Sequence, residues 1–265
     1  MSAESTRKTI TVALGVCLVC SILVSTAAVS LQSIQERNRA LDKLENIVIA
    51  GGLYQKGTDP VRIYEEKITP VLVDLESGEV VPVEKWDESL DPSTFNVKAV
   101  ARDPQYSVRI PEDRDLTKIL RKPKFMPVYQ VTRDTRVERY ILPVYGKGLW
   151  STLYGLLTLD GDLQTLRGIT FYEHGETPGL GGEIDNPLWK EQWDGKLAYD
   201  EDGEVVITVI KGIVDRSSPE AKYQVDGLSG STLTTRAVDK IVKFWLGDSG
   251  YGPYIDNLRE ERADG

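Results

Sequence analysis

Histidine and cysteine are scarce in this chain, and their scarcity excludes several classes of enzyme. The 265 residues include one histidine, His174, and two cysteines, Cys17 and Cys20. A Ser-His-Asp triad would have to use His174, and a zinc site would have to be built almost wholly from carboxylates. Both cysteines lie in an apolar N-terminal segment, so the rest of the chain can form neither a disulfide framework nor an iron–sulfur cluster. We expect no metal site and no catalytic residues of the chain's own.

Positive charge is also in deficit. The chain has 32 Lys and Arg against 41 Asp and Glu, a formal net charge of −9. Proteins that bind nucleic acid neutralise phosphates with a basic face, so we expect no nucleic-acid partner. A Gly-x-Gly-x-x-Gly motif between a strand and a helix is missing as well, which argues against a dinucleotide-binding fold and an NADH site.

A long apolar segment occupies residues 9–31. It contains no charged residue and has about the length needed to span a bilayer. It is a retained anchor, a cleaved signal peptide with Ala28 and Ser30 near the cut, or a lipoprotein signal at Cys17. The segment is long for the apolar part of a signal peptide, which favours the anchor. Residues 1–8 then form a cytoplasmic tail, and the larger part of the chain lies outside the cytoplasm.

The remaining sequence has the pattern of an α+β fold, with a mostly antiparallel sheet and few helices. Residues 33–50 continue the N-terminal helix, and Asp160-Gly161 is a signal for a two-residue hairpin turn. Hairpins are predicted over 71–83, 127–145 and 152–173, helical turns over 116–120, a short helix over 187–193, a strand over 205–210 and an irregular region over 85–113. The predicted parts are a juxtamembrane helix with the first part of the domain (32–125), a cofactor-binding domain (126–248) and a C-terminal tail (249–265).

Residues 226–235 read Asp-Gly-Leu-Ser-Gly-Ser-Thr-Leu-Thr-Thr and precede an amphipathic helix that ends near Gly247. A helix N-terminus offers unpaired N–H groups and the positive end of a dipole, and glycines allow an anion to approach the backbone. Hydroxyl groups can bond its oxygens. This chemistry suits a phosphate, although simple helix capping would need the same residue types.

Two more glycine-rich segments come earlier in the chain. Residues 146–151 read Gly-Lys-Gly-Leu-Trp-Ser, and residues 174–183 hold four glycines and two carboxylates. A tight bend that buries Trp150 in the core would explain the first segment. A single turn at Pro178 does not readily explain the second, because such glycine density after a strand indicates backbone that runs close to another group.

Taken in order, Gly-x-Gly-Leu-Trp (146–150), Glu-Thr-Pro-Gly-Leu-Gly (176–181) and Asp-x-x-Ser-Gly-x-Thr (226–232) resemble the motifs of the FMN-binding domain of redox membrane complexes. With its length and N-terminal span, the chain resembles the C subunits of the Na+-translocating NADH:quinone oxidoreductases. The G subunits of the related Rnf complex share these motifs in typically shorter chains.

The resemblance implies a single-pass protein in a bacterial inner membrane, with its main domain in the periplasm. Such a protein holds covalent FMN and relays electrons within a Na+-pumping reductase of six subunits, some of them polytopic. In this family a flavin transferase joins the FMN phosphate to the last threonine of the motif, which is Thr232 here. Ser231 stands where alanine is usual and is a neighbouring hydroxyl that could accept the flavin instead.

The cofactor-binding residues implied by the resemblance come from the three motifs. They are Leu149, Trp150, Glu176, Thr177, Leu180, Gly181, Asp226, Ser229, Gly230, Ser231, Thr232 and Leu233. We expect Asp226 to help the transferase recognise or position the loop. We expect His174 to pack or form hydrogen bonds, and neither Glu176 nor Glu183 to carry protons.

Two other functions are compatible with parts of the sequence. One is an exported flavin-binding redox module outside a pump. The other is a hydrolase with Ser229 or Ser231 as its nucleophile, for which the chain lacks a credible base.

Overall fold

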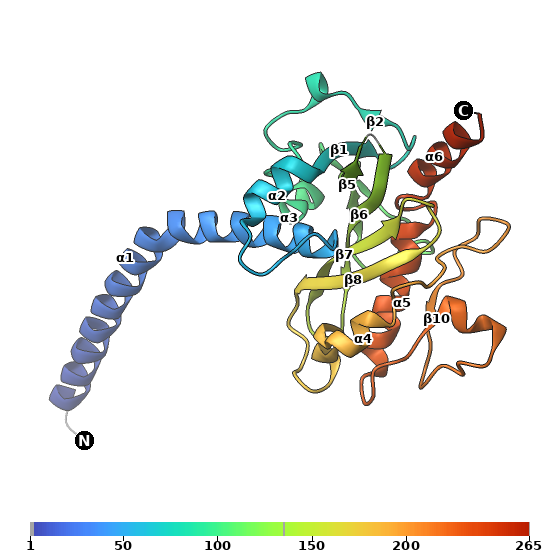
Figure 1. Cartoon of the computed structure of the whole chain (residues 1–265). Coiled ribbons are helices and arrows are strands. Elements are labelled where there is room, and N and C mark those ends of the chain that lie inside the picture. Colours follow the sequence, from blue (N-terminus) through green and yellow to red (C-terminus); the bar gives the residue numbers. More distant parts are fainter. Residues whose placement is uncertain (1–2, 135, 265) are drawn as a thin grey trace. The chain divides into compact units, whose positions relative to one another are not determined.

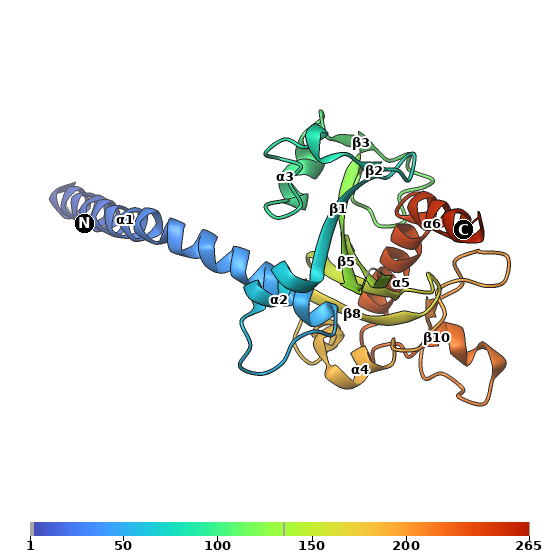
Figure 2. The same ribbon diagram turned by 45° about the horizontal axis from the view of Figure 1, so that its top comes forward.

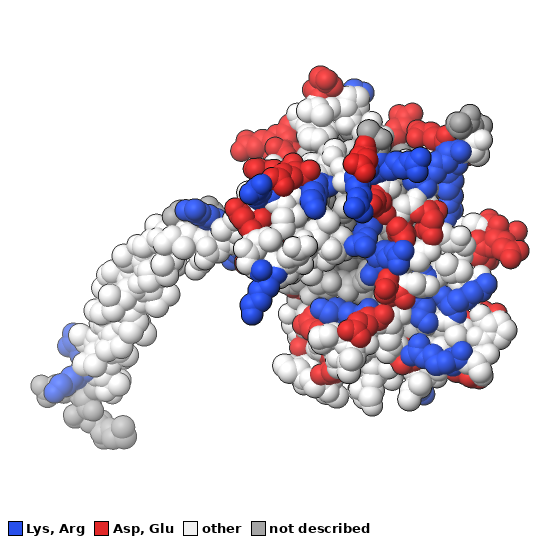
Figure 3. Space-filling model, viewed as in Figure 1, with Lys and Arg blue, Asp and Glu red and all other residues white. Residues whose placement is uncertain are grey.

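The structure, a computed structural model, describes residues 3–134 and 136–264. The chain divides into two compact units, one ending at Lys43 and the other running from Leu44 to Gly265. The first unit consists of most of α1 (Ala3–Ala50). Within α1, Thr6–Gln32 is long and apolar enough to cross a membrane, with a mean hydropathy of 2.5. This stretch contains the predicted span, and Figure 3 shows it free of charged side chains between basic residues near its two ends.

The second unit is built on a six-stranded antiparallel sheet (Figure 1). Each strand pairs antiparallel with its neighbours, which confirms the predicted α+β class and the three predicted hairpins. The strands in spatial order are β2 (Val80–Val81), β1 (Ile68–Asp74), β5 (Phe125–Arg133), β6 (Arg136–Lys147), β7 (Thr152–Asp160) and β8 (Leu166–Glu173).

Shorter elements connect and cover the sheet. Strand β9 pairs parallel with β10, and β3 pairs antiparallel with β4. The short elements are α2 (Pro60–Lys67), η1 (Val83–Lys85), α3 (Val97–Arg102), β3 (Ser107–Arg109), β4 (Arg121–Pro123), η2 (Gly181–Asp185), α4 (Pro187–Glu191), β9 (Thr208–Val209), η3 (Pro219–Tyr223) and β10 (Gln224–Val225).

Both faces of the sheet are covered. Successive side chains of a strand point to opposite faces, so neighbouring residues of one strand contribute to two different hydrophobic clusters. Val128 and Leu142 belong to the larger hydrophobic cluster, which includes residues of α5 (Thr232–Leu246) and the start of α6 (Gly252–Asp264). Their neighbours Tyr129 and Ile141 belong to a second cluster with Ile47 of α1. Figure 2 shows α5 and α6 on the side of the sheet away from α2.

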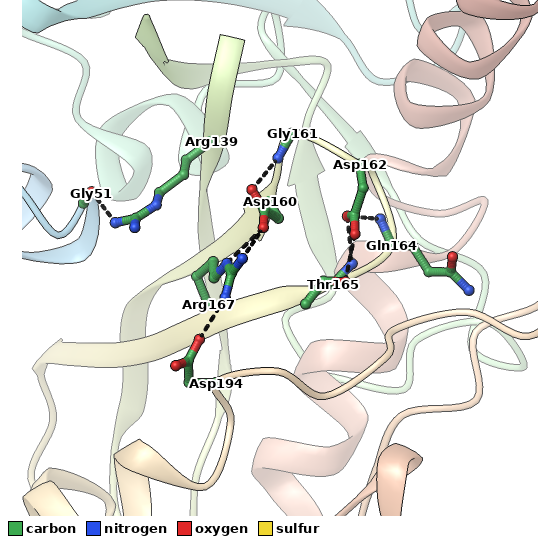
Figure 4. Close-up of polar contacts among 9 residues, drawn as sticks. All are labelled: Gly51, Arg139, Asp160, Gly161, Asp162, Gln164, Thr165, Arg167 and Asp194. Atoms are coloured by element: carbon green, nitrogen blue, oxygen red, sulfur yellow. Dashed lines mark hydrogen bonds and ion pairs between the residues drawn. The ribbon is translucent and has the colours of Figure 1, made fainter. Parts of the chain in front are cut away.

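The β7–β8 hairpin corrects one turn prediction. Asp160-Gly161 does not form a two-residue turn, since the two strands are joined by residues 161–165 and Leu163 has a φ of +61°. The Asp160 carboxylate accepts hydrogen bonds from the Gly161 N–H and from Arg167, whose guanidinium also contacts Asp194 (Figure 4). Leu163 is buried in the core, so the loop folds inward instead of closing tightly.

Three other segments differ from the sequence-based expectations. Residues 116–120 are not helical: Lys118 and Leu120 have positive φ, and the Asp115 carboxylate accepts the N–H groups of residues 119 and 120. The predicted strand over 205–210 is limited to β9, and the short helix predicted to run to residue 193 ends at Glu191. Residues 249–265 are not a tail, because α6 follows Tyr251, which is fully buried.

Candidate functional site

The three glycine-containing motifs meet at a cavity of about 330 Å³. This volume is at the lower end of the range of ligand sites. Leu149, Trp150, Glu176, Thr177, Leu180, Gly181, Gly230, Ser231, Thr232 and Leu233 line it. The structure thus brings together ten of the twelve residues predicted to bind the cofactor and places Asp226 and Ser229 outside the lining.

The wall formed by Leu149, Trp150, Leu180 and Leu233 is apolar and open to solvent. Trp150 is 67% exposed and Leu233 is 56% exposed. The alternative in which the loop buries Trp150 in the core is therefore excluded. Large exposed apolar side chains gathered around one cavity indicate a binding surface for an apolar group.

Thr232 is the first residue of α5 and is exposed, whereas the other hydroxyls of this turn are not. Ser231, Thr234 and Thr235 are all buried, with exposures of 6% or less. The Ser231 hydroxyl donates to Thr234, and the Thr235 hydroxyl donates to the Ser231 carbonyl oxygen. Among the residues that the structure describes, Thr232 therefore carries the accessible hydroxyl at the start of α5.

The N-terminus of α5 also differs from those of the shorter helices. Asp59, Asn96 and Asn186 cap α2, α3 and α4 with side-chain oxygens. Ser231, the N-cap residue of α5, makes no side-chain capping bond. The first N–H groups of α5 are thus available to an anion at the cavity, and the helix dipole favours one there.

Glu176 links the three walls of the cavity. Its side chain is 5% exposed, and its Oε1 atom accepts the backbone N–H of Trp150 at 3.0 Å. Its Oε2 atom accepts the hydroxyl of Thr234 at 2.7 Å. The carboxylate therefore fixes the loop after β6 and the first turn of α5 against its own loop.

Two glycines allow this close approach. A Cβ atom on Gly148 would lie 2.6 Å from Oε1 of Glu176, and one on Gly181 would lie 2.7 Å from Oε2. Either methyl group would overlap the carboxylate, so the glycines flank it from two sides. The expectation that backbone runs close to another group in the 174–183 loop is confirmed at Gly181, and that group is Glu176.

Hydrogen bonds of His174 and Ser151 fix the loop that carries Glu176. The Nδ1 atom of His174 accepts the Glu176 N–H, and its Nε2 atom lies 2.7 Å from Oδ2 of Asp185. The Gly175 N–H donates to the hydroxyl of Ser151 at 2.6 Å. His174 therefore has the hydrogen-bonding role expected for it, and Glu183 pairs with Asn186, away from the cavity.

Asp226 organises the loop before α5 from outside the cavity. Its Oδ1 atom accepts the Val214 N–H at 2.7 Å, and its Oδ2 atom accepts from Arg216 at 2.9 Å. Its own N–H donates to Gln192. Gly230 has a φ of +70°, which turns the chain into α5. Ser229 is exposed and lies just before this turn.

Sequence reasoning missed two contributors to the site. Thr234 joins Ser231 to Glu176, and Arg216 holds Asp226. Thr234 follows Ser231 by one helical turn, so the spacing alone could have placed the two hydroxyls together. No local signal points to Arg216, since its contact depends on the fold of the preceding loop.

Comparisons with known proteins agree with this site. A family profile described as the FMN-binding domain matches residues 148–247, which include every lining residue. The C subunit of the Na(+)-translocating NADH-quinone reductase of Pseudomonas aeruginosa is 45% identical, over 98% of both chains. That of Vibrio campbellii is 41% identical over 97% of each chain.

Solved structures show the same fold. The crystal structure of Shewanella oneidensis NqrC matches with a TM-score of 0.75 and 29% identity, over 84% of this chain and 99% of that one. The C subunit of the Na(+)-translocating NADH-quinone reductase from Parabacteroides distasonis matches with a TM-score of 0.64 and 29% identity, over 85% and 96%. With identities above 40% over nearly the full length of curated relatives, the chain belongs to the family of C subunits of the Na+-translocating NADH-quinone reductase.

Proposed function

We propose that this chain is the FMN-bearing, membrane-anchored subunit that relays electrons in a Na+-translocating NADH-quinone reductase. The observation that carries the proposal is the exposed hydroxyl of Thr232, at the uncapped start of α5 and beside an apolar cavity. The names of the relatives favour the Na+ pump over the Rnf complex and over a redox module outside a pump.

The residues of the cavity fit FMN in two ways. Leu149, Trp150, Leu180 and Leu233 offer an apolar surface to the isoalloxazine ring, and the first turn of α5 offers N–H groups to the phosphate. The cavity is small, so it would enclose only part of an FMN molecule and would leave the rest exposed. An exposed edge suits electron exchange with a cofactor of another subunit.

We further propose that FMN is attached through its phosphate to Thr232 by a flavin transferase. None of the residues that line the cavity is basic, so a free phosphate would be held by helix N–H groups without a paired cation. A covalent bond supplies the retention that such a site lacks. The tether also leaves the ring free to approach a partner.

The bound flavin takes up and releases electrons, and the protein determines its position and surroundings. Thr232 would anchor the phosphate end, and the apolar residues would exclude water from one side of the ring. Glu176 holds the two loops and α5 at fixed separations. In this scheme the residues of the cavity position the cofactor, and none of them transfers a proton.

Replacement of Thr232 tests the attachment. Thr232→Ala and Thr232→Val should abolish covalent flavin and change the free energy of unfolding by no more than about 0.5 kcal/mol, because the side chain is exposed. Ser231→Ala should keep the flavin. The measurement is flavin fluorescence of the denatured polypeptide in a gel, followed by peptide mass spectrometry. Wild-type protein without a covalent flavin, or an adduct on Ser231, Thr234 or Thr235, would contradict the assignment.

The orientation and the partners are part of the same proposal. We place residues 32–265 on the periplasmic side of a bacterial inner membrane, with residues 1–8 in the cytoplasm and polytopic subunits of a six-subunit complex as partners. Protease added to right-side-out spheroplasts should digest the domain, and solubilised membranes should yield it together with several polytopic proteins. Protection in intact spheroplasts would reverse the orientation, and isolation as a lone monomer would favour the redox module.

A further inference from the structure

Two neighbouring residues at the start of α5 carry hydroxyls that a flavin transferase could modify. Thr232 is exposed, and Ser231 is 6% exposed but lines the same cavity. Since the two side chains are adjacent in sequence, the primary structure does not explain why one should be modified and the other not. The hydrogen bonds behind Ser231 supply a reason.

The direction of these hydrogen bonds is fixed by Glu176. A carboxylate only accepts hydrogen bonds, so the Thr234 hydroxyl gives its single proton to Oε2 at 2.7 Å. The Oγ1 atom of Thr234 is then free to accept, and it accepts the proton of Ser231 at 3.2 Å. The Ser231 hydroxyl therefore donates into the protein and away from the cavity.

We propose that Glu176 is a specificity-determining positioning residue that restricts covalent flavin attachment to Thr232. Acting through Thr234, it turns the hydroxyl of Ser231 inward and keeps its proton engaged. The inference rests on the proposed function, in which Thr232 is the acceptor. Glu176 touches Thr234 and the Trp150 N–H, so its effect on the acceptor is indirect.

The reaction explains why the proton matters. The acceptor oxygen attacks the phosphorus atom of the FMN half of a flavin dinucleotide, and a P–O bond to the protein forms. The pyrophosphate bond breaks, adenylate leaves, the hydroxyl proton passes to a base of the transferase, and no group is oxidised or reduced. A hydroxyl whose proton is held by Thr234 must break this hydrogen bond before it can give the proton to the base of the transferase, whereas the exposed hydroxyl of Thr232 has no such cost.

Glu176→Gln should reverse this chain of hydrogen bonds without changing the shape of the side chain. The amide oxygen must face the Trp150 N–H, so the amide NH2 group faces Thr234 and donates to it. Thr234 then turns its own proton toward Ser231, and the Ser231 proton is released to the cavity.

The test is made in full-length protein that lacks the normal acceptor and is coexpressed with the flavin transferase. Thr232→Ala alone should carry covalent flavin only at the background level of the assay. Adding Glu176→Gln should place flavin on Ser231 at roughly tenfold or more above that background, the factor expected for releasing a hydrogen bond in a charged chain. Adding Ser231→Ala as well should remove the label. Glu183→Gln is the matched control, since Glu183 lies in the same loop but pairs with Asn186, and it should give no label.

Thr234→Val provides a second route to the same state, because it removes the hydroxyl that joins Ser231 to Glu176. On the Thr232→Ala background it should also produce label on Ser231. A folded Glu176→Gln or Thr234→Val protein without label on Ser231 would overturn the proposal, as would label on Ser231 in Thr232→Ala with Glu176 intact. The failure of the proposed function would look different, because wild-type protein would then carry no covalent flavin on Thr232.

Discussion

Substitution of Gly181 by alanine tests whether the site depends on close packing around Glu176. Gly181 is buried, and a Cβ atom there would lie 2.5 Å from Oγ1 of Thr234 and 2.7 Å from Oε2 of Glu176. Its φ is not positive, so alanine meets no backbone strain and the cost is steric. The added methyl group must separate the hydroxyl from the carboxylate.

The expected loss of stability in Gly181→Ala is the sum of two contributions. Overpacking a buried position costs about 1–3 kcal/mol. Loss of a hydrogen bond to a charged group adds about 1.5–3 kcal/mol. We therefore expect Gly181→Ala to lower the free energy of unfolding by about 2.5–6 kcal/mol, which for a chain of this size lowers Tm by on the order of 10 °C. Because the same contact shapes the cavity, covalent flavin should also fall.

Gly175→Ala is the matched control in the same loop. There a Cβ atom would lie 3.3 Å from Cβ of Ser151 and 3.4 Å from its Oγ, so only a small adjustment is needed. We expect a change of no more than about 0.5 kcal/mol, typical of a surface substitution. Both variants are compared as full-length protein in detergent by thermal and urea unfolding, with flavin content measured in gels. If Gly181→Ala matches Gly175→Ala in stability and flavin, the packing argument is wrong.

Two further predictions concern residues outside the cavity. Tyr64 is buried, with no hydrogen-bond partner for its hydroxyl among the described residues, so Tyr64→Phe should leave the free energy of unfolding at pH 7 unchanged or raise it by up to about 1 kcal/mol. Burial, with a smaller contribution from Asp91, raises the pKa of Tyr64 to about 12. The unfolded chain loses the Tyr64 proton near pH 10, whereas the folded chain keeps it until about pH 12. The free energy of unfolding should therefore decline between pH 10 and about 12, and it should decline less steeply in Tyr64→Phe. Urea midpoints measured across this pH range would show the difference. Asp226→Ala should slow flavin attachment more than Asp226→Asn, because asparagine can still accept the Val214 N–H. If Asp226 acts by holding this loop, Arg216→Ala should slow attachment as well, and an unchanged rate in a transferase assay would favour direct recognition of Asp226.

Most of the residues that line the cavity could be named from the sequence, because the three motifs that resemble those of FMN-binding domains contain them. The residue types alone left helix capping and a tight bend open as explanations. The contact that joins these motifs could not be foreseen. Thr234 and Glu176 are 58 residues apart, and only the packing of α5 on β6 brings them together.

Two of the wrong predictions of secondary structure, at residues 116–120 and at α6, also have physical causes. Residues 116–120 follow Asp115, whose carboxylate bonds backbone N–H groups and ends the helical tendency of the local sequence. The helix α6 was missed because most of its side chains are polar or charged, and its apolar residues are too few to produce a periodic pattern. Its position depends instead on Tyr251 and Tyr254, which fill the core next to β5 and β6.

The contacts of the C-terminal helices bear on the order of events during synthesis. Trp245 donates to the carbonyl oxygen of Tyr145, 100 residues earlier, and Tyr251 donates to that of Pro143, 108 residues earlier. Strands β5 and β6 therefore cannot complete their core until nearly the whole chain has emerged. Since α5 takes its place only then, the proposed acceptor Thr232 reaches its folded surroundings late. A transferase that requires the folded domain would therefore leave nascent and truncated chains unmodified.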